Sequence, residues 1–164
     1  MLPTVQNDHL NDVLTSIAAM QMTVACPYAQ GNKAILHAYA YMPYMTESGE
    51  CPFFVNRVQG GAVNFQTTMG TQRIPSQIDM ALCVMRDEAA SNLEEAEAEV
   101  LRWRTPVLVT FAAHIRLGGS FPWLQEASIV KYVPFKDFVY CEKHYLASIF
   151  TLSVIELFPI TIGI

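Results

Sequence analysis

The segment that most constrains this chain is residues 145–164, twenty consecutive positions whose only charged side chain is Glu156. Charged residues make up only 15% of the 164-residue chain, and its mean hydropathy is positive. A single domain of this length buries a good core, but it cannot hide this much apolar surface unaided. The segment therefore predicts a partner, which could be a bilayer, another protein or further copies of the same chain.

The composition of this segment favours a β-strand over a membrane helix of the same length. It is rich in β-branched and aromatic residues, carries Glu156 near its middle and contains Pro159. In a strand over residues 145–157, one side carries Leu146, Phe150, Leu152 and Val154, and the other carries Ala147, Ile149, Thr151, Ser153 and Ile155. Neither side is polar, which is typical of a strand covered on both faces in the middle of a sheet. We therefore expect no membrane partner.

Length and composition narrow the classes of protein and of partner that fit this chain. The length and the absence of linkers or repeats predict one domain over residues 1–164. The first residues lack the basic and apolar regions of a signal peptide, so nothing marks the chain for secretion. A net charge of −5 with dispersed basic residues argues against sequence-specific nucleic-acid binding. The cysteines have no metal-ligand spacing and are expected to be reduced and structural: Cys26, Cys51, Cys83 and Cys141.

Hydrophobic periodicity predicts two main helices. The first carries Leu10, Val13, Leu14 and Ile17 on one face and ends before Pro27. The second begins at Ser91, where Glu94 completes a capping box. Its buried stripe consists of Leu93, Val100, Val107, Leu108, Phe111 and Ile115. Because Pro106 falls inside this pattern, the helix is either kinked or split there, and Leu117-Gly-Gly supplies a C-terminal stop.

Strands are predicted over residues 34–42, 51–58, 77–85, 128–134 and 145–157, with residues 135–144 as an aromatic-rich connection. The order of elements predicts an α+β fold, with a mixed, mostly antiparallel sheet of about five strands and two main helices packed on one face. Two helices cover only one face of such a sheet. The other face, including Ile149 and Ile155, would then be left for a neighbouring subunit.

Two segments are expected to make contacts outside the domain. Residues 59–76 are rich in Gly, Thr and Gln and almost uncharged, which predicts a long hairpin or flexible arm that touches the next subunit or another protein. Its candidate contact residues are Val63, Phe65, Met69 and Arg73. The apolar tail over residues 158–164 is too short to span a membrane. Together with Ile149 and Ile155, we expect Phe158, Ile160 and Ile162 in this tail to form an oligomer interface.

No catalytic constellation is evident, so the sequence predicts a protein that is not an enzyme and holds no metal or cofactor. His9, His37, His114 and His144 lack ligand spacing. The acidic run from Glu94 to Glu99 is typical of a solvated helix start, where the helix dipole favours negative charge. Gly60-Gly61 and Gly118-Gly119 match no phosphate-binding loop. Asp79 lies in a largely apolar strand, where it is either partly buried or solvent-facing.

Several local strings resemble the tail terminator and tail completion proteins of long-tailed bacteriophages. The first helix followed by Ala34-Ile-Leu-His-Ala-Tyr-Ala-Tyr-Met-Pro resembles the opening of such proteins, as does the pre-strand Cys51-Pro-Phe-Phe-Val. The second helix running into His114-Ile-Arg-Leu-Gly-Gly-Ser is similar to their helix-to-Leu-Gly-Gly junction. The segment from Tyr140 to Glu156 resembles their final strand, which ends near an acid.

This resemblance implies a small subunit of the virion, assembled in the host cytoplasm into a ring that is commonly hexameric. The ring would lie at the head-proximal end of the tail, with the tail tube protein below it and a neck or connector protein above. It would stop tube polymerisation and join tail to capsid, and an acidic channel would let DNA pass without sticking. Pro106 and the tail beyond Pro159 depart from the family pattern.

Two alternatives remain open. A different neck component, such as a head-closure ring, would have a similar composition but would meet the portal. A small-molecule enzyme or binding domain would instead place a pocket among Tyr39, Tyr41, Trp103 and Trp123. Aromatic residues without a convergent titratable group more often form core, which disfavours this second alternative.

Overall fold

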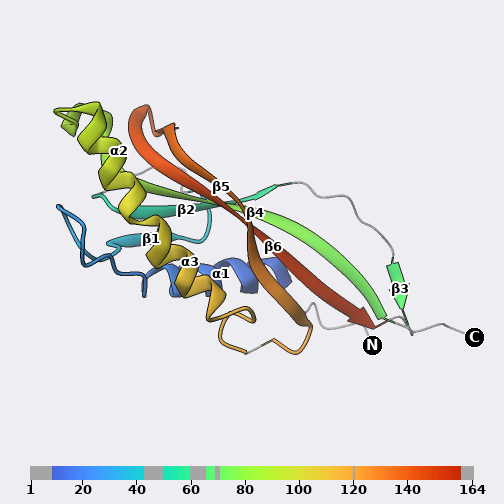
Figure 1. Ribbon diagram of the computed structural model, residues 1–164. Coiled ribbons are helices and arrows are strands. Elements are labelled where there is room, and N and C mark those ends of the chain that lie inside the picture. The colour runs from blue at the N-terminus through green and yellow to red at the C-terminus, as the bar shows by residue number, and fades with distance from the viewer. Residues whose placement is uncertain (1–8, 43–49, 60–65, 69–70, 120, 160–164) are drawn as a thin grey trace, which may run out of the picture.

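A computed structural model of the chain describes residues 9–42, 50–59, 66–68, 71–119 and 121–159. Within these ranges the chain forms three α-helices, a short 3-10 turn and six strands (Figure 1). The helices are α1 (His9–Gln21), α2 (Leu93–Arg102) and α3 (Arg104–Ala112), and the 3-10 turn is η1 (Asp87–Ala89). The strands are β1 (His37–Tyr39), β2 (Phe53–Gln59), β3 (Gln66–Thr68), β4 (Thr71–Arg86), β5 (Leu124–Tyr140) and β6 (Lys143–Pro159).

The strands form one mixed sheet in the order β1-β2-β4-β6-β5, and β3 pairs with the beginning of β4. Only β1 and β2 run parallel, whereas every other pairing is antiparallel. The long strands β4 and β6 pair from Thr71↔Pro159 to Arg86↔Tyr145, and they extend well past the helices (Figure 1). The α+β fold with a mostly antiparallel sheet is therefore confirmed. The apolar segment near the end of the chain is an interior strand, as predicted.

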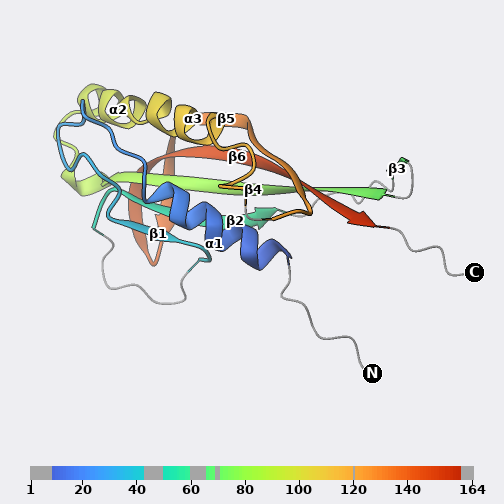
Figure 2. The ribbon, with the colours of Figure 1, turned by 90° about the horizontal axis from the view of Figure 1, so that it is seen from below.

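All three helices contribute to one core with the same face of the sheet. This core contains Val13 and Ile17 from α1, and Val100, Trp103 and Phe111 from the α2–α3 region. The strands contribute Phe54, Leu82, Phe150, Leu152 and Val154, among others. A buried amide pair also ties α1 to β2, because Gln21 and Asn56 each donate a side-chain hydrogen bond to the other, at 2.7 and 2.9 Å. Figure 2 shows α2 and α3 end to end along one side of the long strands.

The second predicted helix is split into α2 and α3 at Trp103, which confirms one of the two outcomes expected from Pro106. Pro106 falls in the first turn of α3, where a missing backbone N–H leaves no intrahelical hydrogen bond unmade. The predicted cap was wrong by one residue. Asn92, not Ser91, caps α2, because its side chain accepts a 2.9 Å hydrogen bond from the Glu94 N–H.

The last two strands are longer than predicted. Residues 135–144 were expected to form a connection, but β5 continues to Tyr140 and β6 begins at Lys143. The turn between them consists of Cys141 and Glu142, whose φ angles of 49° and 63° are both positive. Positive φ at both central residues is characteristic of the tight turns whose twist matches that of the flanking strands. The aromatic residues of this region therefore extend the hairpin.

The long hairpin or flexible arm expected over residues 59–76 is in part a hairpin, because β3 pairs antiparallel with the beginning of β4. Gln59 is the last residue of β2, residues 66–68 form β3, and residues 71–76 belong to β4. Residues 60–65 and 69–70 lie outside the described part of the chain. The predicted strand over residues 34–42 is shorter than expected, since only His37–Tyr39 pairs with β2.

Candidate functional site

The sheet has a second face with none of the described helices over it, and we call this the helix-free face. Phe150, Leu152 and Val154 belong to the core beneath the helices. Because side chains alternate along a strand, Ile149 and Ile155 point to the opposite face. The pairing of β6 with β4 is continuous over this stretch, so no bulge interrupts the alternation. The two residues that the sequence assigned to the uncovered face do lie there, and both are half-buried.

One row of apolar side chains crosses the helix-free face. Val55, Ala81, Ile149 and Val133 lie directly opposite one another on β2, β4, β6 and β5. Residues paired in this way share a face of the sheet. Val55 and Ala81 are buried within the subunit, whereas Ile149 and Val133 are only half-buried. The part of this row on β6 and β5 is thus the part available to a partner.

A charged row lies beside the apolar one. Arg57, Asp79, Thr151 and Lys131 are cross-strand partners on the same four strands. The Gln59 Nε2 donates a 2.8 Å hydrogen bond to Asp79 Oδ2, and the Thr151 Oγ1 donates a 2.7 Å hydrogen bond to Asp79 Oδ1. These contacts fix the half-buried carboxylate between two exposed cations. The row therefore presents a fixed order of charges. In protein interfaces, such charges set register and partner choice more than raw affinity.

One end of the helix-free face is covered by the chain itself. The tip of the β5–β6 hairpin contributes Tyr140 and Tyr145 to a small second core that contains Phe53 and Cys83. The Tyr145 and Phe53 rings meet edge to face, with centroids 5.1 Å apart. The expectation that the whole face is left for a neighbour is therefore too broad. The uncovered area begins beside this tip and follows β4 and β6 toward Pro159.

Three cysteines, Cys51, Cys83 and Cys141, lie in or beside this second core, whereas Cys26 lies in the core beneath the helices. Cys26, Cys51, Cys83 and Cys141 are free thiols, as the sequence predicted. Burial raises the pKa of Cys51 to about 11, although Arg86 opposes the shift, and burial also raises the pKa of Cys83. Because the thiolate is the nucleophile, groups with raised pKa values remain protonated and unreactive at neutral pH. Their contribution here is packing.

The other three candidate interface residues are Phe158, Ile160 and Ile162, and the structure describes only the first of them. Phe158 belongs to the opposite side of β6 from Ile155, and its ring stacks on His9 with centroids 5.1 Å apart. The His9 ring also lies flat on Trp123, at 3.9 Å, and its Nδ1 is 3.4 Å from the buried Glu156 carboxylate. Phe158 thus packs within its own subunit. Ile160 and Ile162 lie outside the described residues, and their place in an interface stays a prediction.

Of the candidate arm residues, only Arg73 is described. It lies in β4 opposite Leu157 and is half-buried, so it belongs to the end of the sheet and not to a loop. Val63, Phe65 and Met69 fall in ranges that the structure does not describe. Their contact with a tube or a neighbour stays a prediction.

The four aromatic residues of the small-molecule alternative do not converge on a common pocket. Trp103 is buried in the helix core, whereas Trp123 stacks on His9. Tyr39 packs edge to face on Phe53, and the Tyr41 hydroxyl donates a 2.7 Å hydrogen bond to Asn11. These four side chains therefore contact different partners, although Trp103 and Trp123 both pack in or against the core beneath the helices.

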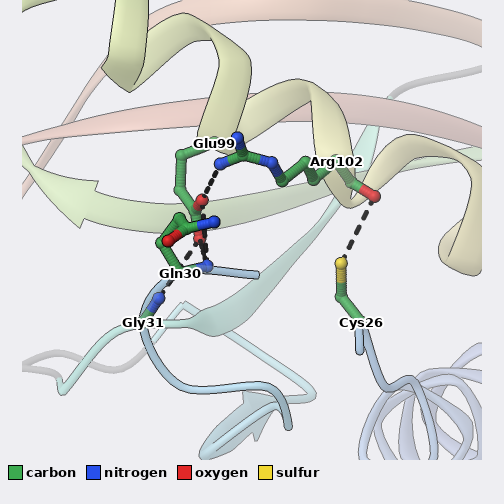
Figure 3. A network of polar contacts seen from close by, with 5 residues as sticks. All are labelled: Cys26, Gln30, Gly31, Glu99 and Arg102. Carbon is green, nitrogen blue, oxygen red and sulfur yellow. Dashed lines mark hydrogen bonds and ion pairs between the residues drawn. The ribbon is translucent and has the colours of Figure 1, made fainter. Parts of the chain in front are cut away.

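A cleft of about 820 Å³ that sequence reasoning missed lies between α2, the loop at residues 30–32, residues 51–52 just before β2, and the end of β4. The buried Glu99 lines it, and its carboxylate accepts hydrogen bonds of 2.9 and 3.1 Å from the Gln30 N–H and pairs with Arg102 (Figure 3). The carboxylate is thus fully engaged by its own chain. No sequence signal could find this contact, because Glu99 and Gln30 are 69 residues apart.

Neither a cluster of metal ligands nor a membrane-spanning helix occurs among the described residues. No group of three or more His, Cys, Asp or Glu side chains among them is arranged to hold a metal ion. The helices in these ranges are all too short or too polar to cross a bilayer. Comparison of the sequence with protein-family models gave no match, and comparison with curated proteins gave none either.

Proposed function

We propose that this chain is a structural virion protein that assembles into a ring at the head-proximal end of a bacteriophage tail. The observation that carries the proposal is the helix-free face, where the half-buried Ile149 and Val133 border a charged row centred on Asp79. An apolar centre with a polar surround is the usual anatomy of a specific protein interface. The resemblance of the sequence to tail terminator and tail completion proteins supplies the biological setting.

In this role the protein acts by self-association and catalyses no reaction. A ring requires a head-to-tail contact in which two different surfaces meet and the rotation closes. We propose six copies, with the tail tube protein below and a neck or connector protein above. The net charge of −5 suits a channel through which DNA passes without binding. The protein would be made in the host cytoplasm and remain in the finished virion.

Particles assembled without this protein test the role directly. If it ends tube polymerisation, negative-stain images will show tails longer than those of the complete particle, because nothing stops the addition of tube subunits. Restoring the protein in trans should return tails to their normal length. Tails of normal length that fail to attach to heads would contradict termination and favour the second candidate, a head-closure or connector ring. That candidate has a similar composition and the same need for an interface.

A further inference from the structure

A second apolar surface lies on the outer side of the helices, and we call it the helix-side groove. It is a depression of about 700 Å³ between the loop that follows α1 and the outer side of α2 and α3. Its lining includes Tyr28, Leu101 and Val109, which are 78%, 40% and 60% exposed. Large apolar side chains gathered this way on a surface mark a binding site for another protein segment more often than single exposed ones do.

The groove presents little polar chemistry to a ligand. The Thr23 Oγ1 donates to the Met20 carbonyl at 2.6 Å, and the Thr110 Oγ1 donates to the Pro106 carbonyl at 2.8 Å. The Arg102 guanidinium is paired with Glu99. Two of the lining hydroxyl groups, those of Thr23 and Thr110, and the Arg102 guanidinium are thus engaged by their own chain. The complementary ligand is an uncharged, apolar segment.

The walls of the groove are held in place before any ligand arrives. The loop wall is fastened to α2 by the Gln30 N–H, which donates to the Glu99 carboxylate, and by Cys26 Sγ, which lies 3.4 Å from the Arg102 carbonyl (Figure 3). Thus the two walls cannot move apart without breaking these contacts. A preformed site loses less conformational entropy on binding than one that must first be ordered.

One segment of this chain has the required chemistry. Residues 160–164, Ile-Thr-Ile-Gly-Ile, carry no charge and place an isoleucine at every second position. In an extended conformation these three side chains would share one face. The segment follows Pro159, which lies at the far end of β6 (Figure 1).

Pro159, the last described residue, lies far from the groove of its own subunit. Arg104, which precedes the groove-lining Thr105, lies over the Tyr132 ring. This ring packs on Phe150, so the start of α3 lies near Phe150. Nine residues of β6 separate Phe150 from Pro159, about 30 Å of strand. Val109 lies five residues further along α3 than Arg104, which is about 8 Å of helix. Even if α3 pointed straight at Pro159, Val109 would therefore be only about 8 Å closer to it than Arg104 is. Five extended residues span at most about 17 Å.

We infer that residues 160–164 of one subunit bind in the helix-side groove of the next. The contact is head-to-tail, as ring closure requires, and it joins the far end of one sheet to the helix layer of its neighbour. This inference rests on the proposed self-association and adds a specific pair of surfaces to it. It also accounts for the apolar character of residues 160–164, for which the helix-free face and the core of the subunit offer no binding site.

Disulfide cross-linking tests this pairing. A chain carrying both Val109→Cys and Ile162→Cys is purified, its mass is measured by light scattering, and it is then oxidised with diamide. Non-reducing gels should show a ladder of covalent multimers that disappears with reductant. The matched control carries Leu93→Cys in place of Val109→Cys. Leu93 is 68% exposed on α2 but does not line the groove, so this pair should give no ladder.

The outcomes separate this inference from the proposed function. A ladder from the Val109 pair alone supports the tail-in-groove contact. If the sample has the mass of an assembly but gives no ladder, or gives the same ladder from the Leu93 pair, the inference is overturned while the ring proposal stands. A monomeric sample without cross-links overturns both. A cross-linked band that stays monomeric on the gel would show that the tail binds its own subunit and would also overturn the inference.

Discussion

Replacing Trp103 with alanine is expected to lower the free energy of unfolding by about 3–5 kcal/mol. Trp103 is 1% exposed and joins α2 to α3, where it packs into the core shared by the helices and the sheet. Its removal leaves a cavity that the surrounding helices cannot fill without shifting. A typical domain is stable by only about 5–15 kcal/mol, so this loss is a large fraction of the total. Urea or guanidinium denaturation measures it.

Trp123→Ala is the matched control for this change. Trp123 is half-buried, and its ring stacks on His9 and Phe121 at the edge of the same core. Because less of this side chain is removed from water, the same substitution should cost less than at Trp103. Equal losses at both positions would contradict the assignment of Trp103 as the centre of the core.

Ile149→Asp is expected to convert the assembly into smaller species. Ile149 is half-buried in the subunit and lies at the centre of the apolar row, beside the charged row that contains Asp79. A new carboxylate would be desolvated in the interface without a partner, and it would stand near an existing negative charge. Size exclusion coupled to light scattering should show the mass falling below that of the ring.

Two further variants separate a broken interface from a broken fold. Ile149→Ala removes apolar contact without adding charge, so it should weaken assembly less than the aspartate does. Leu93→Asp adds the same charge at a site 68% exposed on α2, away from the helix-free face, and should leave the mass unchanged. The far-ultraviolet circular dichroism of all three should match that of the unchanged chain. If the Ile149→Asp protein still formed an unaltered ring, the helix-free face would not be part of the interface.

The sequence predicted the features that depend on local pattern. The β-branched content of residues 145–157 correctly identified an interior strand, and period-two alternation placed Ile149 and Ile155 opposite the helices. Pro106 correctly marked a break between helices, because a missing N–H acts on its own turn. These effects are encoded within a few residues, so no long-range contact is needed to find them.

Features that depend on distant contacts could not be predicted. The aromatic-rich residues 135–144 are predicted as a connection, whereas β5 continues through a register shift between Val133 and Lys136 to pair with β6. The engagement of Glu99 by Gln30 and the charged row centred on Asp79 arise only when remote segments meet in a particular register. The helix-side groove likewise joins a loop near residue 25 to helices beyond residue 100.

Self-association into a closed ring is the central claim, and the mass of the purified protein in solution tests it most directly. Native mass spectrometry, or light scattering over a range of concentrations, should give one species with the mass of six copies of the chain. Its mass should not change on dilution, because a closed ring with an apolar interface core is an obligate assembly. A single species with the mass of one chain at every concentration would contradict the account.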